Sequence, residues 1–136
     1  AMMRTLCFGK PSQRQLDLYD AALEALAAVQ AAIKPGNTFG DGFMAHAKIM
    51  DKRGLGEHRL NACGYSLGAT YAPTWMDWPM LYEKNPVQFR SGMVIFTHII
   101  IFDSNLGLAM TLGETILVTE SGVERLSSAS HNLMVK

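Results

Sequence analysis

The sequence has few cysteines, no excess of charge of either sign and no long apolar run. Its only cysteines, Cys7 and Cys63, are too few and too far apart for a disulfide framework or a thiolate zinc site. We therefore expect two reduced, buried thiols in a cytoplasmic protein. The longest apolar run, Val94 to Phe102, is interrupted by two polar residues and is much shorter than a bilayer span.

Charge and length limit the kinds of binding partner and the number of domains. Lysine and arginine number 12, as do aspartate and glutamate, so the formal net charge is zero. Nucleic acids and anionic membranes bind proteins through excess positive charge, so we expect neither as a partner. With 136 residues, 49% of them hydrophobic, the chain can build one core but not two. We predict a single domain over residues 1–136.

Helical signals dominate the first half of the chain. Ser12 is an N-cap candidate, and an apolar stripe with many alanines predicts a helix over 13–33. Lys34-Pro35-Gly36 ends this helix. A second capping signal at Thr38 predicts a shorter helix that stops near Gly54.

Strand signals dominate the remainder. A short apolar run over 3–8 predicts a strand before the first helix. The segment 54–86 is rich in glycine, proline and aromatic residues without a sustained period, so we expect it to be irregular. Three strands are predicted after it, over 93–102, 109–119 and 123–126. This order of elements is typical of an α+β fold.

Seven short motifs follow one another in an order and spacing that carry a family resemblance. They are Arg4-Thr5, Gly9, Ile33-Lys34-Pro35-Gly36, Gly54-Leu55-Gly56, Gly64-Tyr65-Ser66-Leu67-Gly68, Gly92-Met93-Val94, and Thr115-Ile116-Leu117-Val118-Thr119 with Gly122 and Leu126. The set resembles the C-terminal domain of the creatinase, Xaa-Pro peptidase (proline dipeptidase) and methionine aminopeptidase superfamily. The resemblance implies a truncated pita-bread fold, in which helices flank a curved antiparallel sheet, and a chain that matches the later part of that domain.

The resemblance also implies a metal site that this chain does not reproduce. Family members often hold two divalent metals, such as Mn or Co, with two Asp, one His and two Glu. The second Asp falls on Ala1, the His on Tyr65, and the two Glu on His98 and Gly113, while the first Asp would precede the chain. None of the visible positions keeps its ligand, so we expect no metal cofactor.

One branch of the family offers a different chemistry. The Tyr65-Ser66 pair and the later Pro73-x-Trp75 resemble the ectoine-hydrolase and creatinase-like branch. Some of its members hydrolyse C–N bonds of small compounds without metal, by side-chain acid and base groups. The resemblance then makes His98 the candidate acid or base and Tyr65 a hydrogen-bond donor.

Four further residues are candidates for the same site as His98 and Tyr65. Glu114 adjoins a lost ligand position, although strand alternation is expected to turn its side chain to the opposite face. Tyr71, Trp75 and Trp78 are candidates for a substrate-binding wall over a small-molecule or dipeptide substrate, with packing or a subunit contact as the alternative. His98 itself has a structural alternative as a hydrogen-bonded core residue.

The other histidines are expected to be structural or solvated. His46 lies on a predicted helix and His58 beside charged residues, so both are expected at the surface. His131 is near the end of the sequence and is expected to be solvated.

Three functions remain open on the sequence alone. The chain is the later part of a proline-dipeptidase-like hydrolase, a metal-independent amidohydrolase of the ectoine-hydrolase type, or an inactive family member that binds or oligomerises. An exposed sheet edge and apolar face are expected in each case, and such surfaces are normally covered. We therefore predict a homodimer or a higher oligomer.

Overall fold

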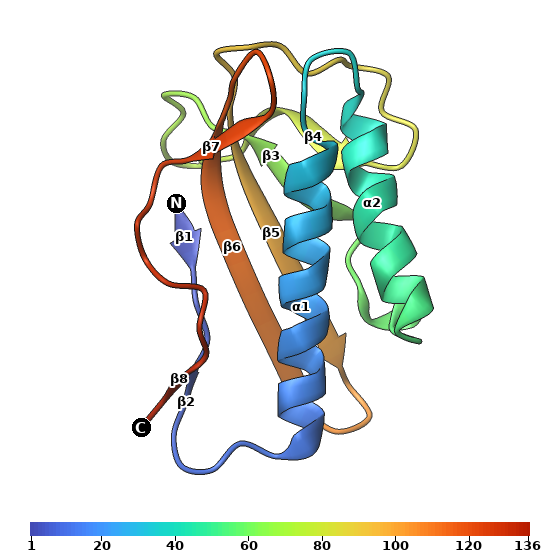
Figure 1. Ribbon diagram of the computed structural model, residues 1–136, viewed down its shortest axis with the longest axis vertical. Coiled ribbons are helices and arrows are strands. Elements are labelled where there is room, and N and C mark those ends of the chain that lie inside the picture. The colour runs from blue at the N-terminus through green and yellow to red at the C-terminus, as the bar shows by residue number, and fades with distance from the viewer.

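The computed structural model describes residues 1–136 as an antiparallel sheet with two helices on one face (Figure 1). The predicted α+β architecture is confirmed. In chain order the elements are β1 (Met2–Met3), β2 (Leu6–Cys7), α1 (Gln13–Ala32), α2 (Phe39–Lys52), a 3-10 turn (Gly56–His58), β3 (Ala62–Ser66), β4 (Asp77–Tyr82), β5 (Val94–Asp103), β6 (Leu108–Val118), β7 (Val123–Arg125) and β8 (Met134–Val135).

Both helices begin at capping boxes, as the sequence predicts. The Ser12 hydroxyl accepts a hydrogen bond from the backbone N–H of Gln15, and the Gln15 side chain accepts one from the Ser12 N–H. Thr38 and Asp41 make the same reciprocal pair at the start of α2. Each box satisfies two N–H groups that the first helical turn leaves without partners.

The main sheet has the strand order β1-β6-β5-β3-β4, and β7 pairs with β6 beyond β1 along the same edge. All of its pairings are antiparallel. The longest pairing joins β5 to β6 and runs from Val94 opposite Leu117 to Asp103 opposite Leu108. A separate parallel pair, β2 with β8, joins the two ends of the chain.

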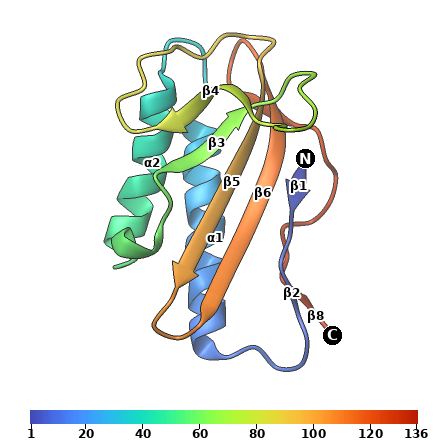
Figure 2. The ribbon, with the colours of Figure 1, turned by 180° about the vertical axis from the view of Figure 1, so that it is seen from behind.

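The hydrophobic core lies between the sheet and the helices. α1 packs against β5 and β6, and α2 packs against β3 and β4. Alternate residues of β5, among them Ile95, Ile99 and Ile101, point into this core and are fully buried. The opposite face of the sheet carries no helix (Figure 2). Neither helix is long and apolar enough to span a membrane.

Two predictions about local structure are wrong. The segment 54–86 is not irregular throughout, because it contains β3 and β4. The register between these two strands is interrupted by irregularities, so their residues show no regular alternation. Pairing within the sheet, rather than local periodicity, therefore defines them. The first strand is also divided: β1 pairs with β6, whereas β2 pairs with β8, an element that no local pattern predicts.

Candidate functional site

A cavity of about 460 Å³ opens on the face of the sheet that the helices leave uncovered. Its volume is in the range of small-molecule sites. Its walls include β1, at one edge of the sheet, and the loop before β4, which forms the other edge. The lining residues are Ala1, Met2, Met3, Leu60, Tyr65, Trp75, Met76, Phe96, His98 and Ile100.

Three rings form the floor of the cavity. Strand alternation places Phe96 and His98 on the same face of β5, and Tyr65 lies opposite Phe96 on β3. The ring centroids of Tyr65 and Phe96 are 5.5 Å apart, those of Tyr65 and His98 5.6 Å, and those of Phe96 and His98 5.7 Å. The structure therefore brings two predicted site residues together, with Phe96 as a third member.

His98 is buried but has no partner. Its residue is 8% exposed, and its Nδ1 is buried without a hydrogen bond. Burial lowers the pKa of His98 from 6.5 to about 4, so the imidazole is neutral at pH 7. A neutral imidazole in an apolar cavity can accept a proton or a hydrogen bond from a bound molecule.

Tyr65 is held in place by Trp75. The indole Nε1–H of Trp75 donates a hydrogen bond to the Tyr65 hydroxyl at 3.1 Å. The hydroxyl oxygen is the acceptor in this bond, so the phenolic proton remains available to a ligand. Tyr71 and Trp78 do not line the cavity and are 81% and 61% exposed, so Trp75 is the one predicted aromatic wall residue that the structure brings to the site.

The residues around the cavity do not fit a two-metal centre. His98 lies opposite Gly113 in the β5–β6 register, so the two positions at which the resemblance expects glutamate are paired. A Cβ atom added to Gly113 would lie 2.7 Å from Cζ of Phe96. The aromatic ring thus occupies the space that a ligand side chain at position 113 would need. No group of three or more His, Cys, Asp or Glu residues is placed to hold a metal ion.

Glu114 faces away from the cavity, as strand alternation predicts. It lies opposite Thr97 in the register and is fully buried. Its Oε2 accepts hydrogen bonds from Arg4 at 2.7 Å and Arg125 at 3.1 Å, and lies 3.0 Å from Nε2 of His131. Burial raises the pKa of Glu114, but the hydrogen bonds from Arg4 and His131 outweigh it and leave the pKa below its usual 4.5.

This ion cluster has a structural role. Arg4 also donates to the carbonyls of Gly113, Ala129 and Ser130. Arg125 donates to the Ala129 carbonyl as well. The four charged or titratable side chains therefore fix the segment after β7 to the edge of the sheet. The structure does not bring Glu114 together with His98 and Tyr65.

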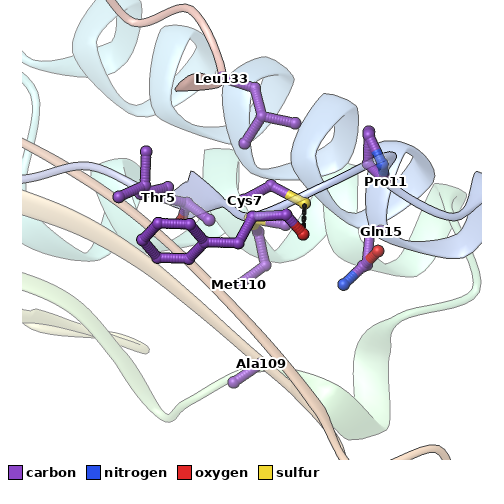
Figure 3. A pocket seen from close by; sticks show the side chains of 9 residues that line it. Thr5, Cys7, Pro11, Gln15, Ala109, Met110 and Leu133 are labelled. Atoms are coloured by element: carbon purple, nitrogen blue, oxygen red, sulfur yellow. Dashed lines mark hydrogen bonds between the residues drawn. The ribbon is translucent and has the colours of Figure 1, made fainter. Parts of the chain in front are cut away.

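A second, smaller cavity of about 220 Å³ lies between β2, the start of α1 and β6 (Figure 3). Cys7 lines it, and the thiol lies 4.0 Å from the carbonyl oxygen of Phe8, to which it donates. The Thr5 hydroxyl is already engaged, because it donates to the Thr111 carbonyl at 2.7 Å. These groups show no arrangement for catalysis.

Three predictions about single residues, those for His46, His131 and Cys7, are wrong. His46 is 1% exposed, because α2 packs it against Phe43 and into the core. His131 is not solvated, since it contacts Glu114. His58, by contrast, lies at the surface as predicted, half-buried and with its Nδ1 2.8 Å from the Phe102 carbonyl oxygen. Cys7 is half-buried rather than buried, whereas Cys63 is buried as predicted.

Phe96 and Ile100 are site residues that the sequence prediction omitted. They alternate with the core residues of β5 and share a face with His98, so the period of two around His98 was a signal for both. Met3 and Leu60 reach the cavity only through the tertiary fold, for which the sequence held no local signal.

Comparison with known proteins identifies the family. The sequence pattern of metallopeptidase family M24 matches residues 1–120. The chain belongs to metallopeptidase family M24. This M24 chain is 33% identical over 136 residues to an ectoine hydrolase of Halomonas elongata, covering 99% of the chain and 33% of that protein. It is 28% identical over 131 residues to an Xaa-Pro dipeptidase of Pyrococcus furiosus, covering 96% of the chain and 36% of that protein.

Solved structures agree with this assignment. The M24 chain superposes on a prolidase from Pyrococcus horikoshii with a TM-score of 0.88 and 27% identity, over 98% of the chain and 37% of the prolidase. A dipeptidase from Mycobacterium ulcerans gives a TM-score of 0.90 at 24% identity, over 98% of the chain and 35% of the dipeptidase. The predicted pita-bread fold and the predicted ectoine-hydrolase branch are both confirmed. The chain spans about a third of the length of these relatives.

Proposed function

We propose that this M24 chain supplies the substrate-facing sheet of a proline-dipeptidase-like hydrolase that acts on peptide or amide C–N bonds. The observation that carries the proposal is the cavity on the uncovered face of the sheet, into which Tyr65 and His98 project from neighbouring strands. Membership of a metallopeptidase family, and relatives named as a dipeptidase and a hydrolase, support it.

We further propose that the usual metal ligands are substituted in this sheet. Position 65 carries a phenol, position 98 an imidazole and position 113 a glycine. The Phe96 ring fills the space over Gly113. This packing supports the substitution of the whole set of metal ligands rather than of one ligand. Tyr65 and His98 thus place a phenol and an imidazole at two of the usual ligand positions, with the ring of Phe96 beside both.

A second candidate function is a metal-independent amidohydrolase of the ectoine-hydrolase or creatinase type. The neutral imidazole of His98 in the cavity lining favours it, because a general base must be unprotonated to accept a proton. In this scheme His98 takes a proton from the attacking water and returns it to the departing nitrogen. Tyr65 donates a hydrogen bond to the carbonyl oxygen, where negative charge develops.

Metal retention tests the proposed substitution, and the preference between two substrates separates the two candidates. The purified chain is incubated with manganese, cobalt or zinc, freed of excess ion and analysed for bound metal. The proposed substitution predicts no retained metal, and one or two equivalents would contradict it. Hydrolysis of an Xaa-Pro dipeptide and of an uncharged amide is then measured without added metal for His98→Gln, with His58→Gln as the control. Unchanged turnover in His98→Gln would contradict the role of His98.

We also propose that the chain works in the cytoplasm as a homodimer or higher oligomer. β4 forms one edge of the sheet, and Trp78 and Met76 are 61% and 43% exposed along it and just before it. Exposed edges and apolar side chains are commonly covered by a partner. Light scattering at micromolar concentration should show more than one chain per particle, and a monodisperse monomer would contradict the proposal. Oligomers without turnover or ligand binding would favour the alternative of an inactive binding or oligomerisation module.

A further inference from the structure

The cavity on the uncovered face of the sheet has no charged side chain in its lining. Nine of its ten lining residues are hydrophobic, and His98 is the remaining one. A ligand that carried a carboxylate or an ammonium into this cavity would lose hydration without gaining a charged side-chain partner.

The polar groups of the floor form one acceptor and one donor. In the tautomer that carries its proton on the buried Nδ1, the neutral imidazole of His98 accepts a hydrogen bond through Nε2. The Tyr65 hydroxyl, which accepts from Trp75, has its own proton to donate. The two rings lie side by side, with centroids 5.6 Å apart. A ligand that satisfies both must present a donor and an acceptor next to each other.

We propose that this cavity selects uncharged amides that present N–H and C=O on one edge, with the N–H donated to His98 and the C=O accepting from Tyr65. The inference rests on the proposed function, because it names the substrate class of the same site. Primary amides and the cis amides of lactam rings have such an edge. The trans amide of a linear peptide directs the two groups to opposite sides, and a free dipeptide adds two terminal charges.

Three isosteric probes test the inference on the unmodified 136-residue chain. Benzamide, benzoate and benzamidinium share a planar shape and differ in charge and in hydrogen-bond pattern. Benzamide offers a donor and an acceptor, benzoate two acceptors and benzamidinium two donors. Binding is measured at pH 7 by NMR titration. We expect benzamide to bind at least about tenfold more tightly than either ion, since each ion leaves one buried polar group unpaired.

Two variants assign the hydrogen bonds. Tyr65→Phe and His98→Leu should each weaken benzamide binding by about tenfold. Tyr82→Phe is the matched control, because Tyr82 lies on the neighbouring strand β4 and does not line the cavity. Circular dichroism confirms that each variant is folded, and the comparison of the three probes on the unmodified chain does not depend on any variant.

The results distinguish this inference from the proposed function. Benzoate or benzamidinium binding as tightly as benzamide, or no binding of benzamide at millimolar concentration, overturns the inference even if the chain hydrolyses charged dipeptides. Selective benzamide binding that Tyr65→Phe and His98→Leu weaken supports it, even if no amide is hydrolysed and the proposed function fails. Equal loss in Tyr82→Phe would overturn the assignment of the two hydrogen bonds.

Discussion

The ring of Phe96 lies directly over Gly113, so that a Cβ atom at position 113 would approach Cζ of the ring to 2.7 Å and Cε2 to 3.0 Å. The two residues belong to the neighbouring strands β5 and β6 and face the same cavity side of the sheet. The position of the Phe96 ring therefore depends on Gly113, since the ring can hold its place only while position 113 lacks a side chain.

Gly113→Ala should destabilise the fold by about 1–3 kcal/mol, because the added methyl group overpacks the contact with Phe96. Adding Phe96→Leu should recover part of this loss, and urea unfolding of the single and double variants measures the coupling. Gly56→Ala is the control, since its added Cβ would meet only the carboxylate of Asp51, whose side chain is 62% exposed and free to move. Additive effects of the two changes would contradict the contact.

Glu114→Gln should lower the free energy of unfolding by about 3 kcal/mol, because it leaves the buried guanidinium of Arg4 without its anion. Glu24→Gln is the matched control. Glu24 pairs with Lys52 and Arg53 at the surface, so its loss should cost much less than the loss of Glu114. Equal effects of the two substitutions in urea unfolding would show that the buried cluster adds nothing beyond a surface ion pair.

The Glu114 cluster also predicts loss of stability in acid. The pKa of Glu114 is lower in the folded chain than its usual 4.5, so the folded chain binds fewer protons than the unfolded chain does. The stabilisation is complete above pH 4.5 and is lost as the pH falls through the folded pKa. Glu114→Gln should flatten the pH dependence of the unfolding free energy below pH 4.5, and an unchanged slope would contradict the cluster.

The burial of His46 and His98 predicts a second pH range, higher than that of Glu114, in which the stability of the fold changes. Burial lowers the pKa of both from 6.5 to about 4, with Arg59 and His98 adding to the effect on His46. Because the unfolded chain binds these protons first, stability should fall as the pH drops from 6.5 to 4, by on the order of 3 kcal/mol for each histidine. His46→Phe should remove about half of this dependence. Thermal melts at pH 7, 5.5 and 4.5 measure it, and a flat profile in the unmodified chain would contradict the burial of both rings.

The two thiols should differ in reactivity. Cys7 is half-buried beside the smaller cavity, whereas Cys63 is fully buried and its burial raises the pKa of the thiol. A thiol reagent at pH 8 should modify one cysteine per native chain and two in urea. Cys7→Ser should abolish the native reaction and Cys63→Ser should leave it unchanged. Two fast-reacting thiols in the native chain would contradict the burial of Cys63.

Local signals predicted the helices and the long strands well. Ser12 and Thr38 fix the helix starts through side-chain caps, which depend only on residues three positions away. β3 and β4 escaped prediction because their pairing partners are distant in sequence and their register is irregular. β8 is only two residues long and exists through its pairing with Leu6 and Cys7.

The candidate site was predicted in part. The family resemblance predicts His98 and Tyr65 as site residues, and the fold places their rings together. The cluster around Glu114 had no local signal, because Arg4, Arg125 and His131 meet there from three separate parts of the chain. The packing of Phe96 over Gly113 likewise required the strand register, which alternation alone does not supply.

The pairing of the first strand with the sixth sets an order for folding. Met2 and Met3 pair with Glu114 and Gly113, and the Arg4–Glu114 contact spans 110 positions. Contacts of this separation require closure of a very long loop, which slows folding. During synthesis β1 therefore stays unpaired until β6 has left the ribosome. The long helix α1 can form throughout that interval, because the backbone hydrogen bonds of a helix join residues only four positions apart.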